Sequence, residues 1–378
     1  MASSHAQKQI YLSRVLGAWS DRLQPLCGAP EPARLGYRQR VTLTTAHDAT
    51  SGWSFGLMRR DELIAIHDCP VHDPRVRALV HYLTERLPPF DVLPLAYLQV
   101  AGRQATLIVK AREVATAALD AVLDAPGSTG VEGLWLHLHP SAGRRLFARS
   151  GWRLVWGSPE SRDELGLVHG PTAFLQPLPA LHLEALEAAA AHLRACEDAS
   201  VLDLYCGHGA TLRIWAGAGA RTLGVELSGE AVRNAARNAP RAQVLRGAAT
   251  QRLPQIRAWW KEGRGEGLAY VNPPRSGLDG EVAQALAQEL RPARIAYLSC
   301  SAGTLARDLD LLEKAGYRID AILPFDFFPQ THHVETLALA GLAGSPAPAQ
   351  RPRRLPSSRS SAARATASSR RRLRLTRG

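Results

Sequence analysis

The chain has 378 residues, of which 46% are hydrophobic, so it is long enough for two domains with sizeable cores. No apolar run is long enough to span a bilayer, and the first residues lack the apolar core of a signal peptide, so we expect no membrane association and a cytoplasmic location. The five cysteines are too scattered for a disulfide framework or a zinc site, and we therefore predict no bound metal.

The formal net charge of +12 is concentrated at the C-terminal end. Residues 345–378 contain ten arginines and no acid, so the rest of the chain carries a charge of only +2. A segment of Arg, Ser, Pro and Ala cannot bury a core, and residues 344–378 are predicted to be disordered. Such a tail can bind phosphates through counterion release, or it can simply increase solubility.

The first half of the chain has the pattern of an α+β region, residues 1–178. An amphipathic helix is predicted over 8–24. Short alternating strands are predicted at 41–43, 53–57, 63–66, 96–100 and 105–109, and a further α+β stretch runs from 134 to 156. Basic and aromatic residues at 37–40 and 59–60 suit contact with nucleic-acid phosphates and bases, although a solvated strand edge has the same composition.

A second region, residues 179–343, alternates strands and helices and predicts a mostly parallel, Rossmann-like sheet. Its first strand ends in Gly-x-Gly at Gly207 and Gly209, and the next strand ends in Glu226, nineteen residues after Gly207. Glycines allow close approach of a ligand to the backbone, and the acid can hold two ribose hydroxyls. The motif alone would serve a dinucleotide equally well. Further strands are predicted at 243–245, 268–271, 294–298, 319–325 and 336–340, the last two forming an antiparallel edge.

Two reactive side chains are predicted at neighbouring strand ends. Cys300 follows a buried strand and precedes a helix over 303–309. The positive end of the helix dipole should favour its thiolate form and make it a nucleophile. Glu335 comes just before the final strand. Since open α/β sheets carry their active sites at strand ends, a nucleophile and a base are expected together there.

Three motifs surround these residues: Asn-Pro-Pro-Arg-Ser-Gly at 272–277, Tyr-x-Ser-Cys-Ser-x-x-Thr at 297–304, and Asp-x-Phe-Pro-Gln-Thr-x-His-x-Glu at 326–335. They resemble the signatures of the RNA 5-methyluridine methyltransferases, which methylate carbon 5 of uridine in tRNA and in large-subunit rRNA. The resemblance implies a class I methyltransferase sheet in 179–343, an RNA-recognition region in 1–178, S-adenosyl-L-methionine as cofactor, and rRNA or tRNA as partner of a monomer.

The resemblance also implies roles for individual residues. The Cys300 thiolate would add to carbon 6 of uracil, and Glu335 would later remove the proton from carbon 5. Cofactor contacts are expected from Gln176, Tyr205, Gly207, Gly209, Glu226 and Asn272. Substrate contacts are expected from Phe174, Asn272, Arg275 and His333.

Several positions depart from the family pattern. Leu178, Ala210 and Ser301 stand where the family has asparagine, and each removes one potential hydrogen bond. Cys69 matches one of four iron–sulfur ligands of some members and stands alone, so no cluster is expected. The departures leave open a catalytically silent RNA-binding or chaperone paralogue. Because Asn-Pro-Pro also serves amino-group methylation of nucleic acids, an enzyme of that kind is a second alternative.

Overall fold

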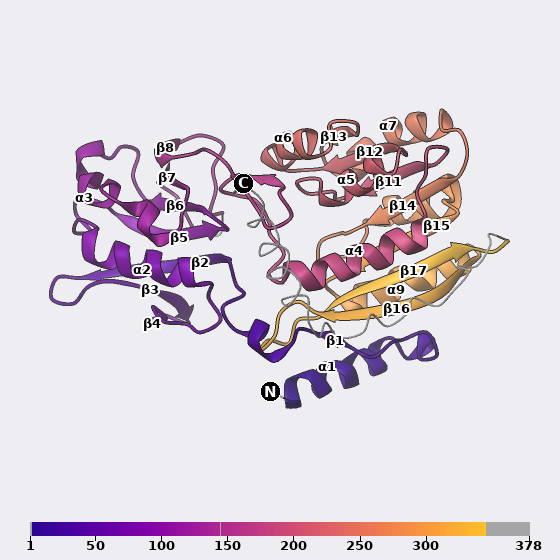
Figure 1. Ribbon diagram of the computed structural model, residues 1–378, viewed down its shortest axis with the longest axis horizontal. Helices are drawn as coiled ribbons and strands as arrows, with labels where there is room; N and C mark the ends of the chain where they lie inside the picture. Colours follow the sequence, from indigo (N-terminus) through magenta and orange to yellow (C-terminus); the bar gives the residue numbers. More distant parts are fainter. Residues whose placement is uncertain (1, 144, 345–378) are drawn as a thin grey trace, which may run out of the picture. The chain divides into compact units, whose positions relative to one another are not determined.

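The structure is a computed structural model that describes residues 2–143 and 145–344. The Arg-rich segment predicted to be disordered lies, from residue 345 on, outside the described residues. Two large sheets and a short hairpin make up the described chain (Figure 1). Among these residues no helix has both the length and the apolar composition needed to cross a bilayer. The same part of the chain has no group of three or more His, Cys, Asp or Glu placed to hold a metal ion.

The C-terminal sheet has eight strands in the order β1-β16-β17-β15-β14-β11-β12-β13. In that order the strands are Cys27–Gly28, Tyr317–Asp326, Glu335–Leu342, Arg294–Ser299, Gly267–Val271, Ser200–Leu204, Arg221–Glu226 and Gln243–Arg246. The strands are parallel except β17, which pairs antiparallel with both β15 and β16. The predicted Rossmann-like class I sheet is confirmed.

Helices cover both faces of this sheet, since its parallel strands are joined by crossovers (Figure 1). On one face α1 (Ala2–Val15), α7 (Ala249–Lys261), α8 (Gly280–Gln284) and α9 (Ala302–Lys314) pack against Leu202, Leu223 and Ile295. On the other face α4 (Pro179–Leu193) and α5 (Ala210–Gly217) pack against Val201 and Leu268, and α6 (Gly229–Asn238) contributes Ala235 to a small cluster beside α5. Alternate residues of β11 therefore face opposite cores.

The second sheet has seven strands in the order β4-β3-β2-β5-β6-β7-β8. They are Glu62–Ala65, Gly52–Arg59, Arg40–Asp48, Leu95–Ala101, Gln104–Val109, Gly133–Leu138 and Trp152–Gly157. The helices α2 (Pro74–Arg86) and α3 (Asp120–Leu123) pack on it through Leu79, Val80 and Val122. A hairpin of β9 (Ser161–Arg162) and β10 (Val168–His169) then leads into α4. The division of the chain at residue 178 remains a prediction.

Three details differ from the sequence-based expectations. The first helix covers Ala2–Val15 rather than 8–24, because the chain turns into a short 3-10 helix at Gly17–Trp19. Strand β1 was not predicted; its two residues are too few for a pattern, and it extends the sheet beyond β16. Tyr37 and Gln39 are 7% and 5% exposed, so these two side chains do not form the nucleic-acid contact or the solvated edge suggested for 37–40.

Candidate active site

One cavity of about 770 Å³ opens at the carboxyl ends of β11, β12, β14 and β15. In open α/β sheets this edge is where ligands bind. The cavity lining includes nearly all the residues selected from the sequence: Phe174, Gln176, Tyr205, Gly207, Glu226, Asn272, Arg275, Cys300, His333 and Glu335. Gly209 is the exception and does not line it.

The glycine loop after β11 is tightly wound. Tyr205 and Gly207 have φ values of 62° and 55°, and such left-handed backbone is costly for Tyr205 but not for glycine. Gly209 has φ 91°, and a Cβ atom there would lie 2.9 Å from Cα of Ala235 on α6. Gly209 therefore lets α5 and α6 pack closely, and the contact with a cofactor expected for it stays a prediction.

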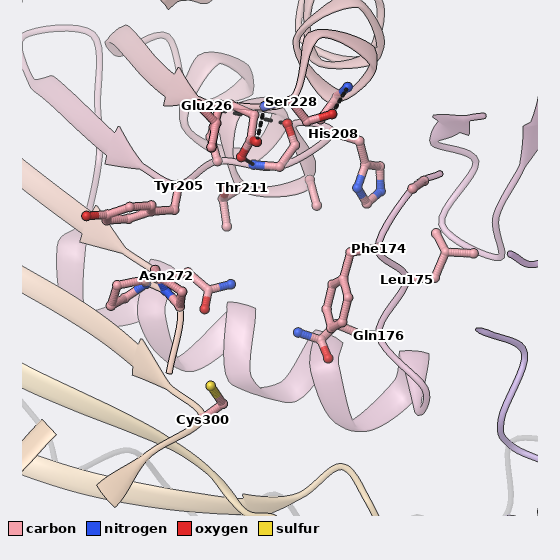
Figure 2. Close-up of a pocket in the computed structure, with 18 of the residues that line it drawn as sticks. Phe174, Leu175, Gln176, Tyr205, His208, Thr211, Glu226, Ser228, Asn272 and Cys300 are labelled. Carbon is pink, nitrogen blue, oxygen red and sulfur yellow. Dashed lines mark hydrogen bonds between the residues drawn. The ribbon is translucent and has the colours of Figure 1, made fainter. Parts of the chain in front are cut away.

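The loop and the end of β12 hold the Glu226 carboxylate in place. Its Oε2 accepts a hydrogen bond from Gly207 N at 3.2 Å, and its Oε1 accepts one from Ser228 N at 2.7 Å (Figure 2). Each carboxylate oxygen has a further lone pair for a ligand hydroxyl. Oε1 of Gln176 and the Tyr205 hydroxyl are buried at the same cavity and have no hydrogen-bond partner among the described residues. Buried polar atoms are normally paired, so these two fit a site that a polar ligand completes.

Cys300 and Glu335 lie side by side at one end of the cavity. β15 and β17 pair antiparallel there, with Ser299 opposite Thr336. Cys300 follows Ser299 and Glu335 precedes Thr336, so these two residues face the same space. Cys300 is half-buried and Glu335 is 5% exposed. Figure 2 shows the Cys300 sulfur pointing toward the space shared with Asn272 and Gln176.

The charge environment of Cys300 differs from the sequence-based expectation. Burial and the neighbouring Glu335 raise the pKa of the Cys300 thiol, and Arg275 acts in the opposite direction. The prediction that the helix N-terminus gives a favoured thiolate in the free protein is therefore not supported. Burial also raises the pKa of Glu335 to about 8, with Arg275 again opposing. Ionisation of one of these two groups therefore makes ionisation of the other less favourable.

Arg275 is a cation that acts on both groups of this pair, and neighbouring residues fix its position. Its Nη2 donates to Nε2 of His333 at 3.2 Å, and its carbonyl oxygen accepts from the Thr304 hydroxyl at 3.2 Å. Burial, His332 and Arg275 lower the pKa of His333, so His333 is available as a neutral acceptor. Arg275 is itself exposed and can reach a ligand anion.

Comparison with known proteins decides the family. The family model described as tRNA (Uracil-5-)-methyltransferase matches residues 265–340. An RNA methyltransferase of Thermosynechococcus vestitus is 30% identical over 339 residues, which cover 83% of this chain and 73% of the relative. The chain belongs to the RNA (uracil-5-)-methyltransferase family. An RNA methyltransferase of Lactobacillus johnsonii is 28% identical over 336 residues, covering 82% of this chain and 73% of the relative.

The family fold is also found among solved structures. A Pyrococcus abyssi tRNA (uracil-54, C5)-methyltransferase in complex with S-adenosyl-L-homocysteine superimposes with a TM-score of 0.67 at 22% identity, covering 90% of this chain and 83% of that one. This likeness establishes a shared fold. The segment matched by the family model begins just before β14 and contains Asn272, Arg275, Cys300, His333 and Glu335.

The N-terminal segment fixes the loop that leads to Glu335 in this family member. Lys8 on α1 is 3% exposed, and its Nζ donates to Asp326 Oδ1 at 2.6 Å and to the Phe328 carbonyl at 3.1 Å. The Tyr37 hydroxyl donates to the Pro329 carbonyl at 2.8 Å. Neither Lys8 nor Tyr37 belongs to a sequence motif, and only the fold brings them to this loop.

Replacing Lys8 by methionine should destabilise the protein by about 3–5 kcal/mol, because Asp326 would remain as an unpaired buried charge. Urea unfolding of the purified protein measures the loss. Lys314→Met is the matched control, since Lys314 and Asp310 are also 2.6 Å apart but are exposed, and such a pair contributes about 0.3–0.5 kcal/mol. Equal losses in the two variants would contradict the role assigned to Lys8.

The raised pKa of Glu335 also predicts how stability depends on pH. An acid whose pKa is raised on folding stabilises the native state while it is protonated, and this stability is lost as pH rises through about 8. Glu335→Gln keeps a neutral side chain, so the variant should lose less stability than the parent between pH 5 and 9, by about 4 kcal/mol. Thermal unfolding at both pH values tests this; parallel pH profiles would contradict it.

Sequence reasoning missed the part of the cavity formed by the hairpin. Asp163 and His208 both line the cavity, with Oδ2 and Nε2 3.6 Å apart. The Thr172 hydroxyl donates to Glu230 Oε2 at 2.7 Å, which ties the segment before α4 to α6. His208 is the middle residue of the Gly-x-Gly motif, whereas Asp163, Thr172 and Glu230 belong to no motif. Their proximity follows from the tertiary fold.

Proposed function

We propose that the protein transfers a methyl group from S-adenosyl-L-methionine to carbon 5 of a uridine in rRNA or tRNA, through transient covalent attachment of the base to Cys300. The observation that carries the proposal is the pairing of Cys300 with Glu335 at one end of the cavity. Carbon 5 of uracil is a weak nucleophile until a thiolate adds to carbon 6, and the proton that carbon 5 already carries must leave after methylation. A thiol and a carboxylate beside one another supply both steps.

The opposite end of the cavity suits the cofactor. Glu226 would accept hydrogen bonds from the ribose hydroxyls, and the unpaired Oε1 of Gln176 would accept one from the ammonium group. The bound cofactor supplies an electrophilic methyl group on a sulfonium. Tyr205 and Gly207 form the loop that lines this end, and the Asn272 amide lies where it can contact either ligand.

The chemistry that we assign to the protein balances as follows. The Cys300 thiolate forms a bond to carbon 6, and the ring becomes an enolate. Carbon 5 then accepts the methyl group as the methyl–sulfur bond of the sulfonium breaks, and S-adenosyl-L-homocysteine is the leaving group. Glu335 then takes the proton from carbon 5, the sulfur–carbon bond breaks, and the thiolate is released. Arg275 would favour each anionic form, because it opposes the pKa rise of both groups. Phe174 is 54% exposed and would stack on the unstacked base.

The division of labour is part of the proposal. Residues 179–343 would carry the chemistry, and residues 1–178 would recognise RNA. The decisive experiment incubates the protein with methyl-labelled S-adenosyl-L-methionine and RNA lacking 5-methyluridine, followed by nucleoside mass spectrometry. Label in 5-methyluridine is the expected result. Label in adenine would identify an amino-group methyltransferase, and RNA binding without label would identify a silent RNA-binding paralogue; either outcome would overturn the proposal.

A further inference from the structure

A second hollow, separate from the cavity described above, lies where β6 and β7 of the seven-stranded sheet end and β8 begins. It has a volume of about 530 Å³ and is lined by Arg112, Trp152, Arg153 and the loop between β7 and β8. Strands β6 and β7 are parallel, so Arg112, which follows β6, meets the loop that follows β7 at one edge. No motif or proposed catalytic step accounts for this feature.

The arginines of this edge are uncompensated. Residues 133–159 contain four arginines, at 144, 145, 149 and 153, and no Asp or Glu. Arg112, Arg145, Arg149 and Arg153 are exposed, and none makes an ion pair among the described residues. Arg103, at the other end of the same sheet, pairs with Glu132 at 2.7 Å. Glu113 adjoins Arg112 in sequence, but no ion pair joins them.

Ring stacking and hydrogen bonds hold the Trp152 side chain that lines the hollow. The Trp152 ring stacks on His137 with 4.0 Å between centroids and 25° between planes. Trp152 Nε1 donates to the Ala148 carbonyl at 2.9 Å, and Ala148 N donates to His137 Nε2 at 3.0 Å. Burial lowers the pKa of His137 to about 4, so the positive charge at this edge is that of the arginines.

The distance between the cavity and the arginines indicates how large a ligand must be to contact both. At the opposite end of β6, a Cβ atom on Gly102 would lie 2.9 Å from Leu175, which lines the cavity. β6 has six residues and therefore separates the two edges by about 20 Å. A uridine in the cavity does not reach the arginines, whereas a folded RNA can occupy both places.

We infer that Arg112 and Arg153, with Arg145 and Arg149 beside them, form a phosphate-binding surface that anchors a folded RNA about 20 Å from the cavity lining at Leu175. The inference rests on the proposed function for the nature of the substrate. Two exposed guanidinium groups on an aromatic wall suit the sugar–phosphate backbone, which supplies most of the affinity and its salt dependence. The surface thus selects structured RNA over short oligonucleotides.

The test compares Arg112→Gln/Arg153→Gln with Arg241→Gln/Arg264→Gln in the full chain. The control residues are exposed and make no ion pair within residues 2–143 and 145–344. They lie in the loops entering β13 and β14, at the sheet edge opposite the cavity. Fluorescence anisotropy measures affinity for an unmodified tRNA transcript over a range of salt concentrations. The first variant should reduce the salt slope by about 1.4–1.8 and weaken binding at 0.1 M salt by roughly 25- to 60-fold, and the control should change neither.

Binding of a five-nucleotide oligouridylate, about 17 Å long when stacked, should be the same in all variants. An unchanged salt slope for Arg112→Gln/Arg153→Gln would overturn the inference. Retained RNA affinity together with lost binding to polyglutamate would also overturn it, because that result would indicate an acidic protein partner. Because binding is measured without methyl transfer, a protein that makes no 5-methyluridine but shows the reduced slope would refute only the proposed function.

Discussion

Cys300→Ala should reduce methyl transfer by on the order of 10⁴-fold or more while leaving cofactor binding intact. Removing a covalent nucleophile removes the whole pathway that depends on it, and only positioning remains. The cavity keeps its shape, because Cys300 is half-buried and its neighbours Ser299 and Ser301 hydrogen-bond each other. Initial rates with labelled cofactor and calorimetric titration with S-adenosyl-L-homocysteine measure the two quantities.

RNA containing 5-fluorouracil gives a second readout of the same variant. Fluorine at carbon 5 cannot leave as a proton, so the thioether to Cys300 persists and the complex survives denaturing electrophoresis. The parent protein should form this complex and Cys300→Ala should not. Cys196→Ala is the control, because Cys196 is exposed and does not line the cavity. A complex that survives in Cys300→Ala would exclude Cys300 as the attachment point.

The sequence predicted the position of Cys300 at a strand end better than the protonation of its thiol. The strands along the chain and the positions of Cys300 and Glu335 at strand ends follow from local patterns, because strand ends and motif spacing are properties of contiguous residues. The pKa of Cys300 does not, since burial and the neighbouring Glu335 outweigh the expected effect of the helix end. That carboxylate is 35 positions away in sequence and becomes a neighbour only when β17 inserts beside β15.

Contacts between residues far apart in sequence also explain why no motif revealed the Lys8–Asp326 ion pair or the arginine surface. Lys8 reaches Asp326 across more than 300 positions, and Arg112 meets Arg153 only because β6 and β7 are parallel neighbours. Charged residues in a sequence look alike whether they are paired or free. The fold decides that Lys8 is buried in an ion pair and that Arg112 and Arg153 have no ion-pair partner in the part of the chain that the structure describes.

Glu335→Gln should lower turnover by about 10²- to 10⁴-fold and cause the protein to accumulate covalently attached to ordinary, unfluorinated RNA. The thiol still adds to carbon 6 and the methyl group still transfers, but no base removes the proton at carbon 5. The product therefore stays bonded to Cys300. Denaturing electrophoresis with labelled RNA detects the complex, and Glu313→Gln, an exposed site on α9, is the control.

The pH dependence separates a base from a residue that only shapes the cavity. Glu335 must be ionised to accept a proton, and its pKa of about 8 means that kcat/KM of the parent should rise with pH up to and beyond neutrality. Ionised Glu335 also raises the pKa of Cys300. In Glu335→Gln that influence is gone, so alkylation of Cys300 by iodoacetamide above pH 8 should be faster than in the parent. Slower alkylation together with no covalent RNA complex would show that Glu335 supports the thiol structurally and is not the base.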